Sequence, residues 1–443
     1  MTERALPHVM IVGGGFGGLA AARALRKTPV RITLVDRSNH YLFQPLLYQV
    51  ATAMLSPGDI ASPIRELVSK QRNITVAMAE VTGVDASNRR VLVGYLGRAD
   101  TPFDYDYLVL ATGASHSYFG HNEFAQFAPG LKSLADATSI LSRVLKAFEV
   151  AEIQEEPSKH RDLLTFVLVG AGPTGVEMAG ALAELRRFTL KSQFRRIDPQ
   201  AARIILVEAA PRILGPFPEE LSRRAQQRLE RMGVEVWTGK AVEKIDQESV
   251  TIGGQRIPCH TVIWTAGVQP SPAGKWLNAL TDKAGRVRVR SDCSVPDRPE
   301  IFVIGDTASL DQDGRALPGV AQVAMQQGRY VASVIHRRVR GQLSPPAFRY
   351  FDKGNMAVVG RAFAILNKDK LQVSGFPAWA AWAFIHILFL PAFGNRLRVW
   401  RQWLWSYLTR QRSSQLIIET RATQVQPKNE VAPESPLRTK NVT

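Results

Sequence analysis

The sequence of 443 residues contains only two cysteines, Cys259 and Cys293, and no Cys-x-x-Cys pair. A disulfide framework or a zinc knuckle needs several cysteines at short, regular spacings. The sequence therefore excludes both kinds of cysteine cluster. We expect two buried thiols in a reducing compartment, and we expect no metal site.

Acidic residues are scarce relative to basic ones, with 39 Asp and Glu against 56 Lys and Arg, which gives a net charge of +17. Such an excess indicates an anionic partner, either nucleic acid or a membrane surface. No nucleic-acid recognition motif is present, and the aromatic residues cluster with aliphatic ones rather than on a polar sheet. We therefore expect no nucleic-acid partner.

The sequence also lacks a hydrophobic run that could cross a membrane. In the apolar stretch 376–393, only thirteen residues separate Pro377 from Pro391, and His386 is among them; a span needs about 20. The apolar run 9–12 is too short for a signal peptide and leads directly into a glycine turn. We expect no transmembrane helix, and a protein that stays on the cytoplasmic side.

What the N-terminal region does contain is a glycine-rich turn in a regular context. An apolar run, 9–12, leads into Gly-Gly-Gly-Phe-Gly-Gly at 13–18, a small-residue helix pattern follows, and a second apolar run, 31–35, ends at Asp36. The glycines fill the pattern G-x-G-x-x-G, which lets a pyrophosphate approach the backbone, and the acid suits ribose hydroxyls. This region predicts a dinucleotide site.

The same pattern returns at residues 165–208. An apolar strand, 165–169, leads into Gly-Ala-Gly-Pro-Thr-Gly at 170–175, and a helix pattern and a strand ending at Glu208 follow. Glu208 favours NADH over NADPH because a carboxylate repels a 2′-phosphate, although Arg212 nearby leaves the strictness of this preference open. Two complete units predict two nucleotide-binding domains.

Two further strands end in small residues. The strand over 105–110 leads into Ala-Thr-Gly at 111–113, and the strand over 261–265 leads into Ala-Gly at 266–267. Small residues let the chain pass close to a cofactor.

A strand over 300–304 leads into Gly305-Asp306. This aspartate suits a hydroxyl of a ribityl chain, which among dinucleotides only FAD carries, so we assign the first unit to FAD and the second to NADH.

A helix is predicted over 320–340, after Pro-Gly at 318–319. Gln322 and Gln326 are four residues apart and share one face of it. If the helix N-terminus meets the flavin, its dipole favours the anionic reduced ring, and the glutamines line a substrate passage; solvent-facing amides are the alternative. Glu177 has two interpretations, a first-turn acid that stabilises the helix dipole or a residue that faces nicotinamide and flavin.

With these motifs the chain resembles the type II NADH:quinone oxidoreductases, which are single-subunit, non-proton-pumping respiratory NADH dehydrogenases. The resemblance covers roughly residues 7–418, and its most particular motif is Ala-Gln-x-Ala-x-Gln-x-Gly at 321–328. The other segments that carry it are 13–18, 43–50, 111–113, 170–177 and 302–306.

The resemblance implies non-covalent FAD in the first unit, NADH in the second and ubiquinone or menaquinone as acceptor. The implied FAD residues are Gly13, Gly15, Phe16, Gly17, Gly18, Asp36, Thr112, Gly113, Asp306, Ala321 and Gln322. The implied NADH residues are Gly170, Gly172, Pro173, Thr174, Gly175, Glu177, Glu208, Ala266 and Gly267. The implied catalytic and quinone residues are Glu177, Gln322, Gln326 and Lys370; spacing does not decide between Lys370 and Lys368 for the lysine near the quinone.

The segment 395–412 has apolar residues at helical spacing, and arginines at 396, 398, 401, 410 and 412 flank or face away from them. A helix rich in tryptophan and arginine suits an interface with anionic lipid; a core-facing helix or a dimer contact is the alternative. The residues assigned to the membrane are Trp379, Trp382, Arg396, Trp400, Arg401, Trp403, Leu404 and Tyr407.

The predicted fold is α/β, with two Rossmann-like dinucleotide-binding domains, the second inserted in the first, and a C-terminal membrane-associating region. We expect the FAD domain over 1–159 and 271–340, and the NADH domain over 160–270. A quinone and membrane-interface region with amphipathic helices follows over 341–412. The tail, 413–443, is expected to be disordered.

The expected reaction is hydride transfer from NADH to flavin N5, followed by transfer of two electrons to a membrane quinone without proton pumping. The expected location is the cytoplasmic face of the cell membrane, as a peripheral protein. One rival is a sulfide:quinone oxidoreductase, which needs redox-active cysteines near the flavin. Another is a soluble NAD(P)H reductase of a different acceptor, and a third is a flavoprotein whose main task is binding a partner.

Replacing both cysteines separates the NADH-dependent reaction from the sulfide-dependent one. We expect a Cys259→Ser/Cys293→Ser variant to keep full NADH:quinone activity, because that reaction uses no thiol. The measurement is steady-state NADH oxidation with a soluble quinone, beside the wild-type protein. Loss of turnover in a folded, flavin-loaded variant would favour the sulfide enzyme instead.

Overall fold

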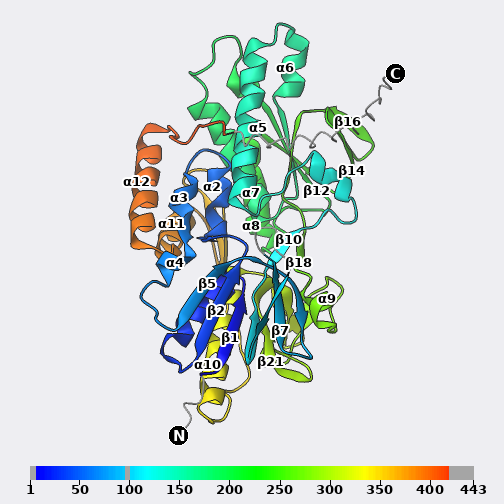
Figure 1. The fold of residues 1–443 in the computed structure, drawn as a ribbon. Coiled ribbons are helices and arrows are strands. Elements are labelled where there is room, and N and C mark those ends of the chain that lie inside the picture. Colours follow the sequence, from blue (N-terminus) through cyan, green and yellow to red (C-terminus); the bar gives the residue numbers. More distant parts are fainter. Residues whose placement is uncertain (1–5, 95–99, 419–443) are drawn as a thin grey trace, which may run out of the picture.

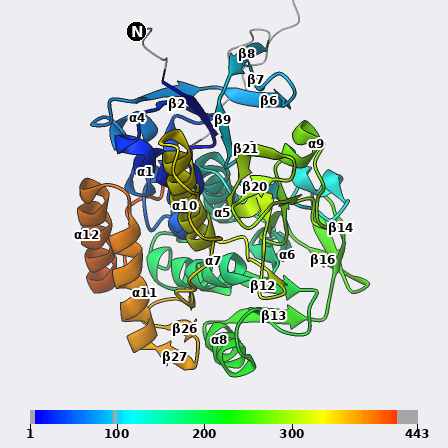
Figure 2. The ribbon, with the colours of Figure 1, turned by 90° about the horizontal axis from the view of Figure 1, so that it is seen from below.

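The computed structural model describes residues 6–94 and 100–418. Figure 1 shows two sheets, one toward each end of an elongated molecule, with helices packed against both. The C-terminal helices α11 (Phe376–Phe389) and α12 (Phe393–Thr409) lie together along one side, as Figures 1 and 2 both show. The sites described below form where these three parts meet.

The first sheet contains the N-terminal glycine unit and has the strand order β20-β21-β9-β1-β2-β5. All pairs are parallel except β20 with β21. The strands β1 and β9 are almost wholly apolar because helices or strands cover the sheet on both faces. The bounds are β1 His8–Val12, β2 Arg31–Asp36, β5 Ile74–Met78, β9 Tyr107–Leu110, β20 Ser294–Val295 and β21 Arg298–Val303.

The second sheet contains the second glycine unit and has the order β13-β12-β11-β17, with every pair parallel. Its bounds are β11 Thr165–Val169, β12 Arg203–Glu208, β13 Val234–Thr238 and β17 Thr261–Trp264. Helix α7 (Pro173–Glu184) follows β11 and continues into a π-helical turn, Leu185–Thr189. π-Helical turns are rare in proteins, and those that occur often lie at functional sites.

Two short antiparallel strands carry the chain between the sheets. They are β10 (Ala114–His116) on the way out and β18 (Val268–Pro270) on the way back. After the return, β21 pairs with β9 in the first sheet. The second nucleotide-binding domain is therefore inserted in the first, as the sequence predicted.

The helix before the predicted domain boundary at residue 160 packs on both domains. Helix α5 (Leu134–Ile153) contacts β17, and its Phe148 stacks on Phe166 of β11 at 5.6 Å between ring centroids. It also contacts α2 (Leu47–Val50) of the first domain. The boundary at residue 160 therefore stays a prediction, because an amphipathic helix pattern does not indicate which elements its apolar face covers.

The remaining elements pack around these two sheets. The further helices are α1 Phe16–Ala24, α2 Leu47–Val50, α3 Pro57–Ile60, α4 Ile64–Leu67, α6 Pro157–Leu163, α8 Glu219–Arg231, α9 Ala273–Leu277 and α10 Ala321–Val339. The further strands up to residue 258 are β3 His40–Leu42, β4 Ala61–Pro63, β6 Glu80–Asp85, β7 Arg90–Gly94, β8 Thr101–Asp104, β14 Val242–Ile245, β15 Ser249–Ile252 and β16 Gln255–Pro258. Those after it are β19 Val287–Arg288, β22 Ala308–Ser309, β23 Asp311–Gln312 and β24 Arg315–Ala316.

The C-terminal region begins with a three-stranded antiparallel sheet. Its strands are β25 (Asn355–Val358), β26 (Ala364–Lys368) and β27 (Leu371–Gly375). The turn after β25 packs tightly on α7: a Cβ on Gly180 would lie 2.9 Å from the backbone nitrogen of Gly360. This contact joins the C-terminal region to the second nucleotide-binding domain.

Helix α12 docks against the first domain through Asn395. The buried Asn395 amide donates to the carbonyl oxygens of Gly58, Asp59 and Ala61 at 3.3, 2.9 and 3.1 Å. One side chain thus satisfies carbonyl groups at and beyond the end of α3. No helix within the described ranges, 6–94 and 100–418, is both long and apolar enough to cross a membrane.

The prediction of a disordered tail was wrong for its first residues. The chain at 413–418 runs back over the protein: Ser414 N–H donates to the Ala53 carbonyl, and Ile418 N–H donates to Ser142 Oγ at 3.2 Å. Arg412, just before it, is 4% exposed. These bonds hold the segment, and its sequence gives no sign of partners that lie so far away in the chain. Residues 419–443 lie outside the described part of the chain.

Helices α1 and α10 cross through two glycines, which yields a test of the packing. A Cβ on Gly328 would overlap the Gly17 carbonyl oxygen. We expect Gly328→Ala to lower the thermal denaturation midpoint, because overpacking costs about 1–3 kcal/mol, although alanine alone would favour the helix by about 1 kcal/mol. Gly215→Ala is the control, because nothing lies within 4 Å of a Cβ there. Equal midpoints for the two variants would refute this packing argument.

Candidate active site

A long cleft opens over the edge of the first sheet where its parallel strands end. Its volume is about 490 Å³, within the roughly 300–1,000 Å³ of most small-molecule sites. Nine of the residues assigned to FAD line it: Gly13, Gly15, Phe16, Gly17, Asp36, Thr112, Gly113, Asp306 and Ala321. Arg37, Ser38, Gln44 and Lys132 also line it and were missed, because they belong to no glycine or small-residue motif.

The remaining two residues assigned to FAD do not line the cleft. Gly18 lies behind the turn, where a Cβ would overlap the Gly13 carbonyl oxygen, so it serves the close packing of helix on strand. The Gln322 amide points instead to the chain at 353–354.

The two acids at the strand ends brace the two glycine turns in the same way. Asp36 Oδ2 accepts a hydrogen bond from Gly14 N–H at 2.7 Å, and Glu208 Oε2 accepts one from Ala171 N–H at 2.7 Å. Both carboxylates are half-buried. The sequence indicated acids for ribose hydroxyls, and the structure adds that each acid also fixes the turn beside it.

The cleft fits a dinucleotide by its backbone as well as by its size. No side-chain oxygen or nitrogen caps the N-terminus of α1, whose N-cap residue is Gly15, or of α7, whose N-cap residue is Gly172. An added Cβ would meet nothing within 4 Å at either glycine. The first N–H groups of both helices are thus accessible, as pyrophosphate binding requires.

The predicted small residues at the strand ends lie against the first glycine of each turn. A Cβ on Gly170 would lie 2.7 Å from Ala266, and one on Gly13 would overlap the Ala111 carbonyl oxygen. Gly267 is shielded by the Phe119 ring. The first glycine of each turn therefore has the same kind of neighbour in the two units.

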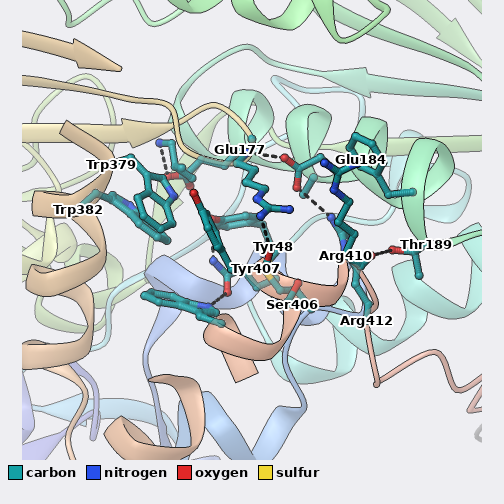
Figure 3. A pocket seen from close by; sticks show the side chains of 18 residues that line it. Tyr48, Glu177, Glu184, Thr189, Trp379, Trp382, Ser406, Tyr407, Arg410 and Arg412 are labelled. Carbon is teal, nitrogen blue, oxygen red and sulfur yellow. Dashed lines mark hydrogen bonds and ion pairs between the residues drawn. The ribbon is translucent and has the colours of Figure 1, made fainter. Parts of the chain in front are cut away.

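A second cavity lies directly behind the cleft, and the same two chain segments separate them. Gln44 and Pro45 line the cleft, whereas Tyr48 and Gln49 line the cavity. In the second segment, Thr174 lines the cleft and Glu177, one turn further along α7, lines the cavity. Figure 3 shows this cavity, with Glu177 of α7 toward aromatic residues of α11 and α12 and Glu184 of α7 toward the arginines.

The environment of Glu177 bears on its two interpretations. Burial raises the pKa of Glu177 to about 8, and a hydrogen bond from Val358 N–H at 3.3 Å lowers it by less. The carboxyl group therefore holds its proton at neutral pH, and a protonated group does not stabilise a helix dipole. Glu177 lines the cavity and not the cleft, so its role facing nicotinamide and flavin stays a prediction.

Polar groups on the opposite wall are linked by hydrogen bonds. The Trp403 indole N–H donates to Gln49 Oε1 at 2.8 Å, and Gln49 Nε2 donates to the Tyr48 hydroxyl oxygen at 2.9 Å. Burial raises the pKa of Tyr48 far above its usual value, so this phenol stays protonated. Trp382 is 2% exposed and lines the cavity, and its indole N–H has no partner among the described residues.

A buried ion pair closes one end of the cavity. Arg412 lies 3.4 Å from Glu184 and donates to the Thr52 carbonyl oxygen at 2.7 Å. The other carboxylate oxygen of Glu184 accepts from Arg361 N–H. Arg412 thus joins both nucleotide-binding domains to the C-terminal region, and it is not one of the outward arginines that the sequence suggested.

Gln322 and Gln326 share one face of α10, as predicted, and both bind the backbone of residues 351–354. Gln322 donates to the Gly354 carbonyl at 3.1 Å and accepts from Lys353 N–H at 3.3 Å; Gln326 donates to and accepts from Phe351 at 3.0 Å. Neither lines the cleft or the cavity. The neighbouring Gln327 was missed: its buried side chain accepts from Gly305 N–H at 2.7 Å and fixes the Gly-Asp turn.

Lys370 is not brought together with the other assigned residues. It is exposed in the turn between β26 and β27, and it lines neither the cleft nor the cavity. Lys368 is closer to the two glutamines. Its ammonium group lies 5.8 Å from the ring centroid of Phe351, which belongs to the segment that the glutamines bind. The cations in the cavity wall are Arg361, Arg410 and Arg412.

The residues assigned to the membrane divide into two groups. Trp379, Trp382, Trp403 and Tyr407 face inward and line the cavity. Trp400, Arg401 and Leu404 are exposed, whereas Arg396 is half-buried and donates to the Leu390 carbonyl at 3.0 Å. The membrane assignment of these residues stays a prediction; helical spacing alone does not show which face packs on the protein.

The two cysteines line neither site. Both are buried, and burial raises the pKa of the Cys259 thiol to about 12 and that of Cys293 still further. Neither thiol has the lowered pKa or the exposure of a reactive cysteine. This arrangement speaks against the sulfide enzyme.

Comparison with known proteins agrees with this geometry. Residues 7–328 match the family model of the pyridine nucleotide-disulphide oxidoreductases, the class of enzyme that two nucleotide-binding domains of this kind define. The chain is 43% identical to the type II NADH:quinone oxidoreductase Ndh of Mycobacterium tuberculosis, over 94% of this chain and 91% of the relative. It is 42% identical to NdhA of the same organism, over 93% and 89%.

A solved structure of similar fold is that of NDH2 from Plasmodium falciparum in complex with NADH. It superposes with a TM-score of 0.84 at 18% identity, covering 93% of this chain and all of that one. The chain belongs to the type II NADH:quinone oxidoreductases.

The raised pKa of Glu177 predicts a pH dependence of stability. An unfolded glutamate ionises near 4.5 and the folded one near 8, so between these values the unfolded state binds fewer protons and stability falls as the pH rises. A Glu177→Gln variant lacks this loss. We therefore expect the denaturation midpoint of the wild type to fall relative to that of the variant from about pH 5 to pH 8.

The control for this measurement is Glu220→Gln. Hydrogen bonds from Arg223 and Arg224 lower the pKa of Glu220, so its replacement changes the pH dependence only in the acid range. Parallel profiles for wild type and Glu177→Gln would show that Glu177 is ionised in the folded protein.

Proposed function

We propose that this protein binds FAD non-covalently in the cleft of the first domain and oxidises NADH bound over the second glycine turn. The observation that carries the proposal is the position of α7. Its first turn forms part of the second nucleotide site, and Thr174 in that turn lines the cleft of the first. A nicotinamide extending from this turn reaches the flavin cleft, where bound FAD supplies the hydride acceptor.

We propose that a quinone accepts the electrons from the cavity behind the cleft. Aromatic side chains of Trp379, Trp382, Trp403 and Tyr407 give it an apolar wall that suits a quinone ring. The protonated Glu177 and the guanidinium group of Arg410 line this cavity and are donors suited to quinone carbonyl oxygens. Reduction of a quinone to a quinol takes two electrons and two protons, and Glu177 can deliver one of these protons to the oxygen it faces.

Gln322 and Gln326 fit this scheme as residues at the quinone entrance. Both hold the segment 351–354, which leads directly into β25. The last residue of β25, Val358, donates its N–H to Glu177 and lines the cavity. By holding the segment before β25, the glutamines help to position Val358 in the wall of the cavity. They can also contact the quinone directly. Lys368 and Lys370 lie at the other end of the same small sheet.

We further propose that the protein binds the cytoplasmic face of the cell membrane through α11 and α12. Of the 23 large hydrophobic side chains that are exposed in the described chain, ten lie on these two helices. An apolar face of this kind marks a membrane or protein contact. The alternative is that this face binds a second copy of the chain. A dimer in lipid-free buffer would indicate that alternative, and a monomer would indicate membrane binding. The family resemblance also implies a reaction that pumps no protons.

Replacement of Gln322 tests the acceptor side. We expect Gln322→Leu to raise the quinone KM or lower turnover several-fold, because it releases the chain at 353–354, while flavin reduction by NADH stays fast. The two half-reactions are separated by stopped-flow measurement of flavin absorbance and steady-state assay with a soluble quinone. Gln226→Leu is the control, because Gln226 lies on α8, lines neither site, and donates to Glu230 of the same helix. If flavin reduction collapsed instead, Gln322 would belong to the NADH side.

A further inference from the structure

A groove runs between α3 and α12, at the edge of the exposed apolar face and separate from the cleft and the cavity. Three parts of the chain form it: the start of α3, the outer side of α12, and the chain just beyond α12. Its lining residues are Ser56, Asp59, Arg398, Arg401, Gln402, Leu404, Trp405, Leu408, Ser413 and Ser414. The groove therefore combines two arginines, small hydroxyl groups and three apolar side chains.

The charges in the groove leave one positive charge uncompensated. Asp59 is mostly buried and already accepts from Ser56 N–H and Oγ at 2.8 and 2.7 Å, and Arg398 lies 3.5 Å from it. Arg401 is exposed and has no hydrogen bond or ion pair with any residue of the described ranges. The groove thus suits a ligand with a single negative charge.

The groove is continuous with the apolar face of α12. Successive residues of a helix are about 100° apart, which places Leu397, Leu404 and Leu408 on one line along α12. Arg401, Trp405 and Arg398 follow in that order around one side of this line, toward α3. Leu408 is 71% exposed and Trp405 is 57% exposed. A molecule with a charged group in the groove can therefore lay its apolar part along the helix.

The walls of the groove are held in place without a ligand. Arg398 donates to Asn395 Oδ1 at 2.8 Å, and Asn395 is itself buried against α3. On the other side Gln402 donates to Ser413 Oγ at 2.6 Å, and Ser414 N–H donates to Ala53. A preformed site loses little conformational entropy when a ligand binds.

We propose that this groove binds the headgroup of a monoanionic phospholipid, such as phosphatidylglycerol. Arg401 and Arg398 contact the phosphodiester, the hydroxyl groups of Ser56 and Ser413 contact the polar headgroup, and the acyl chains lie along Leu404 and Leu408. The proposal rests on the proposed binding of α11 and α12 to the membrane and gives it a defined lipid. It also sets the rotation of α12 about its axis, because the groove fixes which side of the helix faces the headgroups.

The test uses short-chain lipids below the concentration at which they form micelles, so that a site is distinguished from a charged surface. Dihexanoyl phosphatidylglycerol is titrated into the FAD-loaded full chain, and binding is followed by calorimetry. We expect saturable binding of one lipid per chain, at least tenfold weaker in Arg401→Gln and in Arg398→Gln/Arg401→Gln. Arg401→Gln breaks no contact within the described protein, so it keeps the test valid if the double variant fails to fold.

The control variant is Arg256→Gln, which removes the same charge from β16 on the opposite side of the molecule (Figures 1 and 2). We expect it to bind phosphatidylglycerol like the wild type. Equal binding by wild type and Arg401→Gln would overturn the proposal, and so would equal binding of dihexanoyl phosphatidylcholine. Saturation by inorganic phosphate at the same concentrations would show that the groove takes free phosphate and not a lipid, which also overturns it.

NADH oxidation with a water-soluble quinone is measured on the same samples. We expect it to be unchanged in every variant, because the groove is separate from both the cleft and the cavity. Absence of turnover in the wild type would overturn the proposed function, whereas intact turnover with no lipid binding would overturn only the lipid site.

Discussion

The close contact of α7 with the turn after β25 is the constraint on which the site depends. Gly180 and Gly360 lack side chains at the point where the two backbones meet. This lets the C-terminal region approach α7 until Val358 reaches Glu177 and the aromatic side chains of α11 and α12 close over the cavity. Because α7 also begins at the second glycine turn, one helix holds the nucleotide site, borders the cleft and carries the acid of the cavity.

The two buried acids of the cavity, Glu177 and Glu184, have different surroundings. Glu184 meets Arg412, and this ion pair joins three parts of the chain. Among the described residues no cation pairs with Glu177, which holds its proton instead. A buried carboxyl group that keeps its proton near neutral pH is suited to giving it up during a reaction. Two acids two turns apart on one helix thus have different partners.

Helices α11 and α12 are apolar on two faces for two reasons. Trp382 stacks on Trp403 at 5.2 Å, and Trp379 on Tyr407 at 5.6 Å, and these pairs build the wall of the cavity. The other face, with Leu397, is exposed along the side of the molecule. Helices with two apolar faces suit the proposed contact with a membrane on one side and the cavity on the other.

The sequence by itself determined the class of fold, the two glycine turns, the acids at their strand ends and the family. These features follow from local rules: a tight turn needs glycine, and a strand buried on both faces needs a continuous apolar run. The insertion of the second domain was also readable, because strands with the same small-residue ending occur on both sides of it.

Only the tertiary structure decided what depends on packing between distant segments. Helical spacing gave the apolar positions of α12, but the docking of Asn395 on α3 decided that Trp403 faces the cavity and Trp400 faces outward. The protonation of Glu177 required burial by residues that lie up to 230 positions away in the chain, such as Tyr407. The same holds for Arg412, whose sequence context is that of a solvated arginine, because its partners Thr52 and Glu184 meet it only in the folded protein.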